Sequence, residues 1–281
     1  EFADYVLGSL KGSSTSYRTA YGNTQTVLML RGIKQGDPLA PLLYIIVMDI
    51  LHSALRKKQL GYNQGDSQIS SEGYADDTAL IAGEWKNLTL NHCTVLEFCQ
   101  FFSIAVNRSK TQLTGRLVGG GDIHQSLSMH DGELVVATSG SVACKYLGLW
   151  IAVNGDWKKQ RGVLAYLVEV YCAAIRYSIL KLEEGVKINN EYLMPKLEYR
   201  MAFMVLDAGS MKKWQRSIDS TLTSLDRGTS NMGRAAMVVG LGLRLVEDQA
   251  IALRVNGLVR SITMGSWGRR LGALANGLQK G

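Results

Sequence analysis

The chain has 281 residues, enough for one large domain or two smaller ones with buried cores. Apolar residues make up 46% of it, which argues against disorder, and its longest apolar run, residues 41–48, is too short to span a bilayer. The net charge of +7 is uneven: residues 1–150 carry 12 Lys and Arg against 13 Asp and Glu, whereas residues 151–281 carry 19 against 11. A basic half favours a polyanion such as nucleic acid as a partner, although a solvated, Lys- and Arg-rich helical region would have the same composition.

No signal-peptide pattern is visible, and the four cysteines lack the CxxC spacing of zinc sites. We therefore expect an intracellular protein of the cytoplasm or nucleus that is neither secreted nor membrane-bound.

The first half of the chain alternates between strand-like and helical patterns. Asp37 followed by Pro38 predicts a helix start, and the apolar residues all round that helix predict that it is buried. Asp131 and Gly132 predict a tight turn inside a pair of strands. In chain order we expect a short helix over 2–10, a hairpin from 15–20 and 25–31, a helix from 37 to about 56, strands over 70–73 and 78–82, a helix over 85–105, and strands over 110–115, 126–137 and 143–153.

The pattern becomes helical from Trp157 onward, after the turn-forming residues 154–156. Helices are expected over 157–183, 188–206, 210–225 and 245–263. This order predicts an α+β domain over residues 1–155, followed by an all-α domain over residues 156–281.

Residues 73–80 read GYADDTAL and place two carboxylates, Asp76 and Asp77, inside a strand-like stretch. Adjacent like charges repel unless a cation lies between them, and a tight turn can direct both to one site. Mg²⁺ prefers hard oxygen ligands, and two such ions about 4 Å apart can activate an attacking hydroxyl and stabilise a leaving pyrophosphate. Taken alone, the pair leaves a solvated Asp-Asp turn open as the alternative.

A second segment, RGIKQGDPLAP at residues 31–41, precedes the first long helix. Gly32 and Gly36 permit close approach of the backbone to a ligand, and a helix N-terminus favours phosphate. Gln35 offers both a donor and an acceptor, which suits base or sugar edges. A plain strand-to-helix turn is equally compatible with this segment.

Together, QGDPLAPLLY and the YADD about 30 residues beyond it resemble the palm of a reverse transcriptase, and more narrowly that of non-LTR (LINE-like) retrotransposons. Ala40 departs from the serine common in that family. Three later segments match in the same order: residues 107–111 are similar to the NxxKT segment, residues 146–148 to the primer-grip hairpin, and residues 240–243 (GLGL) to the segment after the thumb. The resemblance covers about residues 1–265. It implies a partial right-hand polymerase palm, an antiparallel sheet with packed helices, followed by an all-α thumb or connector.

The resemblance also implies roles for individual residues. Asp76 would be a direct metal ligand and Asp77 would assist it, with two Mg²⁺ ions in the complete enzyme. Lys110 would act as a third catalytic residue near the triphosphate, unless it is an exposed lysine at a strand start. The residues implied to lie along the template, the primer terminus and the incoming nucleotide are Lys34, Gln35, Gly36, Tyr74, Tyr146, Leu147 and Gly148.

The expected function is RNA-directed DNA polymerase activity of a retrotransposon, in which a DNA primer on an RNA template attacks a dNTP by two-metal nucleotidyl transfer. Such palms need a third carboxylate several tens of residues before the QGDPL segment, and Asp4, the one Asp there, looks like a surface helix residue. We therefore expect this chain alone, without that carboxylate and the fingers, to have little or no activity. The alternative is a non-catalytic, nucleic-acid-binding remnant of a decayed element. A purely structural helical protein would explain neither motif, and the oligomeric state stays open.

Overall fold

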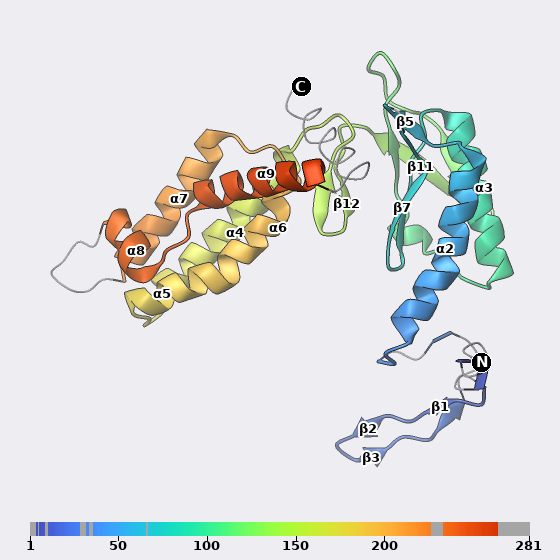
Figure 1. Ribbon diagram of the computed structural model, residues 1–281, viewed down its shortest axis with the longest axis horizontal. Coiled ribbons are helices and arrows are strands. Elements are labelled where there is room, and N and C mark those ends of the chain that lie inside the picture. The colour runs from blue at the N-terminus through green and yellow to red at the C-terminus, as the bar shows by residue number, and fades with distance from the viewer. Residues whose placement is uncertain are drawn as a thin grey trace. The chain divides into compact units, whose positions relative to one another are not determined.

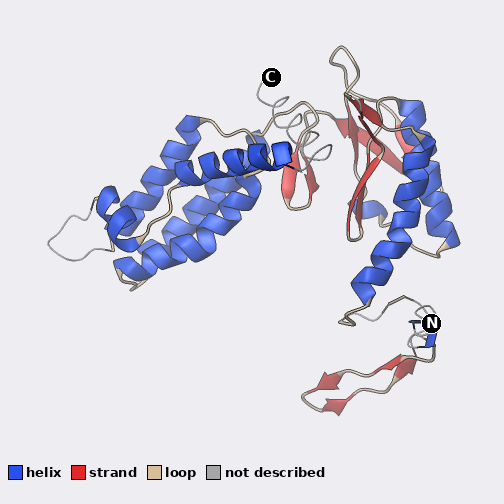
Figure 2. Cartoon of the chain, in the orientation of Figure 1, coloured by secondary structure: helices blue, strands red, loops and turns tan. Residues whose placement is uncertain are grey.

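The computed structural model describes the chain apart from residues 1–3, 5, 9–10, 29–31, 34–35, 66, 226–232 and 264–281, and apart from the side chains of residues 258–263. The chain forms two compact units, Glu1–Val106 and Asn107–Gly281. The structure contains helices and small, mostly antiparallel sheets (Figure 2), which is the content expected of the α+β class. Strands give way to helices between residues 151 and 158, close to the expected boundary at 155, although the compact units divide earlier in the chain.

The first unit joins short hairpins to two long helices. Its elements are β1 (Ser14–Thr15), β2 (Arg18–Thr19), β3 (Gly22–Asn23), β4 (Val27–Leu28), α2 (Ala40–Lys58), β5 (Tyr62–Gln64), β6 (Ser67–Ile69), β7 (Ser71–Tyr74), β8 (Asp77–Leu80) and α3 (Trp85–Phe101). Strands β1 and β4 pair antiparallel, as do β2 and β3 between them, so the early hairpin is confirmed over its described residues. Residues 29–31 and much of the expected helix over 2–10 lie outside the described residues.

Helices α2 and α3 pack against each other beside β7 (Figure 1). Leu51 and Leu55 of α2 are buried against Phe98 and Cys99 of α3, which forms the core of this unit. Helix α2 begins at Ala40, later than the sequence indicates, because the Asp37 carboxylate accepts a hydrogen bond from Leu39 N at 2.8 Å in a turn that precedes the helix.

The expectation that α2 is buried all round is wrong for the described part of the chain. Its residues Leu42, Ile45, Ile46 and Ile50 are 46–61% exposed. Apolar composition on every side permits burial, but burial also needs a neighbour on each side, and described residues cover one face only.

The second unit begins with a 3₁₀ helix and two small sheets. Its first elements are the 3₁₀ helix Arg108–Lys110, β9 (Leu113–Gly115), β10 (Ser126–Ser128), β11 (Leu134–Ser139), β12 (Cys144–Tyr146) and β13 (Leu149–Ile151). Strand β11 pairs antiparallel with β10 and parallel with β9. The expected turn between residues 126 and 137 is confirmed, but the single strand over 143–153 is wrong. Leu147 and Gly148 have φ of 47° and 78°, which reverses the chain between β12 and β13.

Helices form the rest of the second unit around one apolar core. They are α4 (Lys158–Arg176), α5 (Leu182–Ile188), a π-helical segment (Asn189–Leu193), α6 (Met194–Met201), α7 (Ala208–Thr223), α8 (Arg234–Leu241) and α9 (Val246–Thr263). Leu164, Leu197, Ile218 and Leu222 are fully buried in this core, where α4, α6, α7 and α9 meet (Figure 1). None of the helices described is both long and apolar enough to cross a membrane.

Several helix boundaries differ from those expected, and the helix predicted over 188–206 ends at Met201. The helix predicted over 157–183 ends at Arg176, and a new one starts after Lys181, whose N–H donates to the Glu184 carboxylate at 2.8 Å. Helix α8 was not predicted. It ends inside the GLGL segment, where Gly242 adopts φ of 67° and Leu243 N donates back to Met237 O, the hydrogen-bond pattern of a glycine-terminated helix.

Candidate active site

The two adjacent carboxylates lie at the tip of the β7–β8 hairpin. Tyr74 and Asp77 form the last strand pair, so Ala75 and Asp76 make a two-residue turn. Of these two, only Ala75 has a positive φ, 51°. A positive φ at the first central residue alone is the pattern of a type II′ turn, a position that usually carries glycine. An alanine there holds an uncommon backbone conformation, and such conformations concentrate at functional sites.

The hairpin is tighter than the sequence indicates, and this changes the setting of Asp77. The expected strands stop at residue 73 and resume at residue 78, whereas β8 already begins at Asp77. Asp76 is therefore a turn residue and Asp77 a strand residue. Both are solvent-exposed, so a cation could approach the tip without any displacement of the core.

The pair fits part of a Mg²⁺ ligand set. Among the described residues, no group of three or more Asp, Glu, His or Cys side chains is arranged to hold a metal ion. Mg²⁺ is nevertheless often bound through one or two carboxylates, with waters and substrate phosphates completing its octahedron. Two exposed carboxylates in adjacent positions match that donor chemistry but leave most of the coordination to other ligands.

Helix α2 supports the hairpin through His52. Its Nδ1 lies 2.8 Å from Ser71 Oγ at the start of β7. A Cβ on Gly73 would lie 2.4 Å from His52 Nε2, so any larger residue at this position of GYADD would force the imidazole ring to move. Burial, followed by the positive charge of Arg56, holds the pKa of His52 below its usual range, which favours the neutral ring in this contact.

Tyr44 lies two turns before His52 on α2, where the charge of Asp76 at the hairpin tip influences its hydroxyl. Burial raises the pKa of the Tyr44 hydroxyl, and the negative charge of Asp76 raises it further. The hydroxyl therefore stays protonated near the carboxylate. Neither Tyr44 nor His52 was singled out from the sequence. Their spacing of eight residues, which places both on one face of a helix, is the signal that could have found them.

The other residues expected around the carboxylates are placed only in part. Lys34 and Gln35 lie outside the described residues, while Gly36 is exposed and has φ of 91°, a conformation that favours glycine. Lys110 is exposed at the end of its 3₁₀ helix. Because Lys110 belongs to the second unit and the carboxylates to the first, its proximity to them stays a prediction.

Tyr146, Leu147 and Gly148 form the turn region of the β12–β13 hairpin. Tyr146 pairs with Leu149, and the two positive φ values between them match a type I′ turn. Tyr199 of α6 donates a hydrogen bond from its hydroxyl to Leu147 O at 2.6 Å. This contact ties the hairpin tip to the helical part of the same unit.

Replacing Tyr199 by phenylalanine should loosen this hairpin. The change removes the hydroxyl donor and leaves the Leu147 carbonyl to bond with water, so we expect the local stability of the hairpin to fall by about 0.5–1.5 kcal/mol. Hydrogen exchange of the β12 and β13 amides measures it, and faster exchange is expected. Tyr192→Phe is the matched control, because the Tyr192 ring instead receives the Lys196 ammonium at 3.5 Å. Equal exchange in both variants would contradict the role assigned to the Tyr199 hydroxyl.

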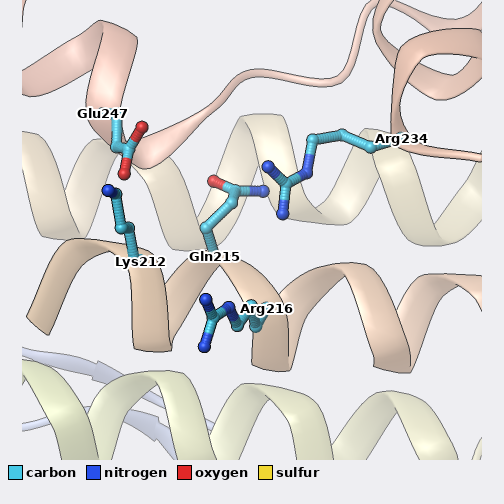
Figure 3. A pocket seen from close by; sticks show the side chains of 5 residues that line it. All are labelled: Lys212, Gln215, Arg216, Arg234 and Glu247. Atoms are coloured by element: carbon cyan, nitrogen blue, oxygen red, sulfur yellow. The ribbon is translucent and has the colours of Figure 1, made fainter. Parts of the chain in front are cut away.

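A small pocket of about 220 Å³ lies between α7, α8 and α9 (Figure 3). Its lining residues are Lys212, Gln215, Arg216, Arg234 and Glu247. Gln215 is buried, accepts from Val246 N at 2.8 Å and donates to Asp219 Oδ1 at 2.8 Å, while Arg234 forms an ion pair with Asp219. These bonds join all three helices, so the pocket is a packing junction rather than a second reactive site.

The chain matches one protein family and is similar to retrotransposon polyproteins. Residues 6–151 match the family model described as reverse transcriptase (RNA-dependent DNA polymerase). The chain is 26% identical over 225 residues to a retrovirus-related Pol polyprotein from the type-1 retrotransposable element R2 of Popillia japonica, which covers 78% of this chain and 31% of that protein. It is 24% identical over 224 residues to the polyprotein of the type-2 element R2DM of Drosophila melanogaster, covering 77% of this chain and 20% of that protein. The chain thus spans a third or less of the length of these two relatives.

Proposed function

The chain belongs to the reverse transcriptase (RNA-dependent DNA polymerase) family, and we propose that it supplies the catalytic hairpin and the nucleic-acid-binding helices of a non-LTR retrotransposon polymerase. The observation that carries this proposal is the pair of exposed carboxylates at the tip of β7–β8, inside the segment that matches the family. The substrates would be an RNA template, a DNA primer and dNTPs.

Asp76 and Asp77 would hold the divalent cations. When bound, two Mg²⁺ ions would activate the primer 3′-hydroxyl and stabilise the leaving pyrophosphate. Asp76 would bind metal directly, and Asp77, fixed in the strand, would assist through water or the second ion. Tyr74, which is 69% exposed and is the strand partner of Asp77, would pack near the primer terminus. His52 would act as a positioning residue that holds β7 against α2.

Further residues would bind the substrates. Lys110 would lie near the triphosphate, neutralising its charge or donating a proton to pyrophosphate. Lys34, Gln35 and Gly36 would follow the template and the incoming nucleotide. The hairpin that Tyr199 holds at Leu147 would position the primer through residues 146–148.

Residues 1–155 would form the partial palm and residues 156–281 the thumb and the region after it. The second part carries 19 Lys and Arg against 11 Asp and Glu. This excess of cations suits a duplex backbone, because neutralised phosphates release their counterions.

We further propose that this chain by itself has little or no polymerase activity. Two carboxylates from a single hairpin offer few of the oxygens that Mg²⁺ requires, and the described residues contain no third partner for them. The same observation also supports the alternative function, in which the chain is a remnant that binds nucleic acid without catalysis.

Primer extension by the 281-residue chain tests both proposals. With an RNA template, an annealed DNA primer, dNTPs and Mg²⁺, we expect the primer–template to bind, more weakly as salt rises, and to be extended little or not at all. Robust extension that Asp76→Ala abolishes would overturn the proposed incompleteness and exclude the non-catalytic alternative. No binding even at low salt would contradict both functions.

A further inference from the structure

A groove of about 800 Å³ in the second unit combines aromatic and basic side chains where α4 begins. Trp150 of β13 and Tyr166 of α4 line it together with Lys158 and Lys159. Trp150 is half-buried, whereas the Tyr166 side chain is 65% exposed. The volume is within the range of about 300–1,000 Å³ that small-molecule sites occupy.

Trp150 is held as a fixed platform. Its backbone N–H donates to Gln160 Oε1 at 2.9 Å, and Gln160 is fully buried in the first turn of α4. On the other side of the ladder, Trp150 pairs with Lys145 of β12. Because the backbone that carries the ring is fixed by both a strand and a helix, a stacking ligand has only the side-chain rotamer of Trp150 left to order.

One face of the Trp150 ring already meets a cationic partner. Lys159 Nζ lies over it, 5.2 Å from the ring centroid. Such an ammonium on a mobile four-carbon stem can move from the ring toward a phosphate while a flat group takes its place.

The charge of the groove favours an anion. Neither Lys158 nor Lys159 forms an ion pair with any residue that the structure describes. Asp156 also lines the groove, but its carboxylate accepts from Lys158 N at 2.8 Å and lies 3.9 Å from the Arg161 guanidinium. The Lys158 ammonium is therefore left to meet a ligand, and the Lys159 ammonium can do so once it moves off the Trp150 ring.

We propose that this groove binds an unpaired nucleotide of single-stranded RNA or DNA, with its base stacked on Trp150 and flanked by Tyr166, and its phosphates against Lys158 and Lys159. Every base has a π face and every nucleotide a phosphate, so a strand matches both kinds of side chain at once. An acidic peptide would satisfy the lysines but would leave the ring faces unused. The inference rests on the proposed nucleic-acid function and adds a single-strand site to it.

Tryptophan fluorescence of the full chain tests the proposal, with oligothymidylate and oligouridylate of about eight nucleotides as probes. We expect both to bind and to quench the emission. Trp150→Phe should lose most of the quench and keep affinity within about threefold, because phenylalanine still stacks. Trp150→Ala and Tyr166→Ala should each weaken binding by about 5- to 150-fold, the loss typical of one base–aromatic stack. The matched control is Tyr177→Ala, since Tyr177 is 91% exposed three turns along the same helix face and outside the groove.

Two further probes separate stacking from charge. An abasic strand of equal length and a polyglutamate peptide should bind at least tenfold more weakly and should not quench. Lys159→Ala should reduce the salt dependence of binding by about 0.7 in the slope of log affinity against log salt. Equal binding of the abasic strand, or equal loss in the Tyr177 and Tyr166 variants, would overturn the stacking site. If duplex primer–template still bound in that case, the proposed function would stand without it.

Discussion

Asp76→Asn is expected to weaken metal binding at the hairpin at least tenfold and, in any preparation that extends a primer, to reduce nucleotide addition by on the order of 10³-fold. Asparagine keeps the size and turn preference of aspartate but removes the negative charge that attracts the cation. A bound metal ion contributes several kcal/mol to transition-state charge stabilisation, and each 1.36 kcal/mol corresponds to a factor of ten in rate. The exposed position of Asp76 means that the change should leave folding intact.

Metal binding can be followed without catalysis. Mn²⁺ prefers the same oxygen ligands as Mg²⁺, and its paramagnetism should broaden the amide NMR signals of residues 71–80. Loss of an outer-shell partner alone costs about 10- to 100-fold in metal affinity, so loss of a ligand should raise the midpoint Mn²⁺ concentration at least tenfold. Glu97→Gln, which removes one exposed carboxylate charge from α3, should leave the midpoint unchanged. Equal broadening in wild type and Asp76→Asn would contradict the metal site.

Gly73→Ala is expected to disrupt the same hairpin by a steric route. The new Cβ would lie 2.4 Å from His52 Nε2, so the ring must move and its 2.8 Å contact with Ser71 must change. Overpacking of this kind costs about 1–3 kcal/mol. Hydrogen exchange of the β7 and β8 amides reports the loss locally, which suits a chain with two compact units.

Removing the ring should restore the hairpin. In the double variant His52→Ala with Gly73→Ala, exchange should be slower than in Gly73→Ala alone, because the two positions act through one contact. Gly83→Ala is the control, since its Cβ would meet Tyr62 at an ordinary 3.7 Å. If His52→Ala gave no rescue, the clash would not be the reason for glycine at residue 73.

Local sequence signals located the elements around the carboxylates well. GYADDTAL predicted a turn between two short strands. The structure has that hairpin, but its turn is shorter by one residue on each side, because β7 ends at Tyr74 and β8 begins at Asp77. Asp37 predicted a helix start, although its carboxylate serves a turn before α2 rather than the helix itself. These features depend on neighbouring residues, so they can be read from a short stretch of chain.

Contacts between distant residues were not predictable in the same way. Tyr171 illustrates this: it looks like any apolar residue of α4, yet its hydroxyl donates to Gly185 O at 3.2 Å, and burial raises its pKa. The exposed face of α2 could not be predicted for the same reason. Its apolar pattern indicates burial, but the actual exposure depends on which other elements cover that face.

The sequence by itself determined the family motifs, the adjacency of Asp76 and Asp77, and the basic second half, because residue identity and spacing are local properties. Only the tertiary structure decided how the two hairpins are held: the His52 ring closely approaches Gly73 of the β7–β8 hairpin, and Tyr199 binds the turn of the β12–β13 hairpin at Leu147, 52 residues away. It also decided that Trp150 and Tyr166 share one groove with two lysines. Each of these depends on the packing of an element against another that is remote in the chain, where no local periodicity specifies the partner.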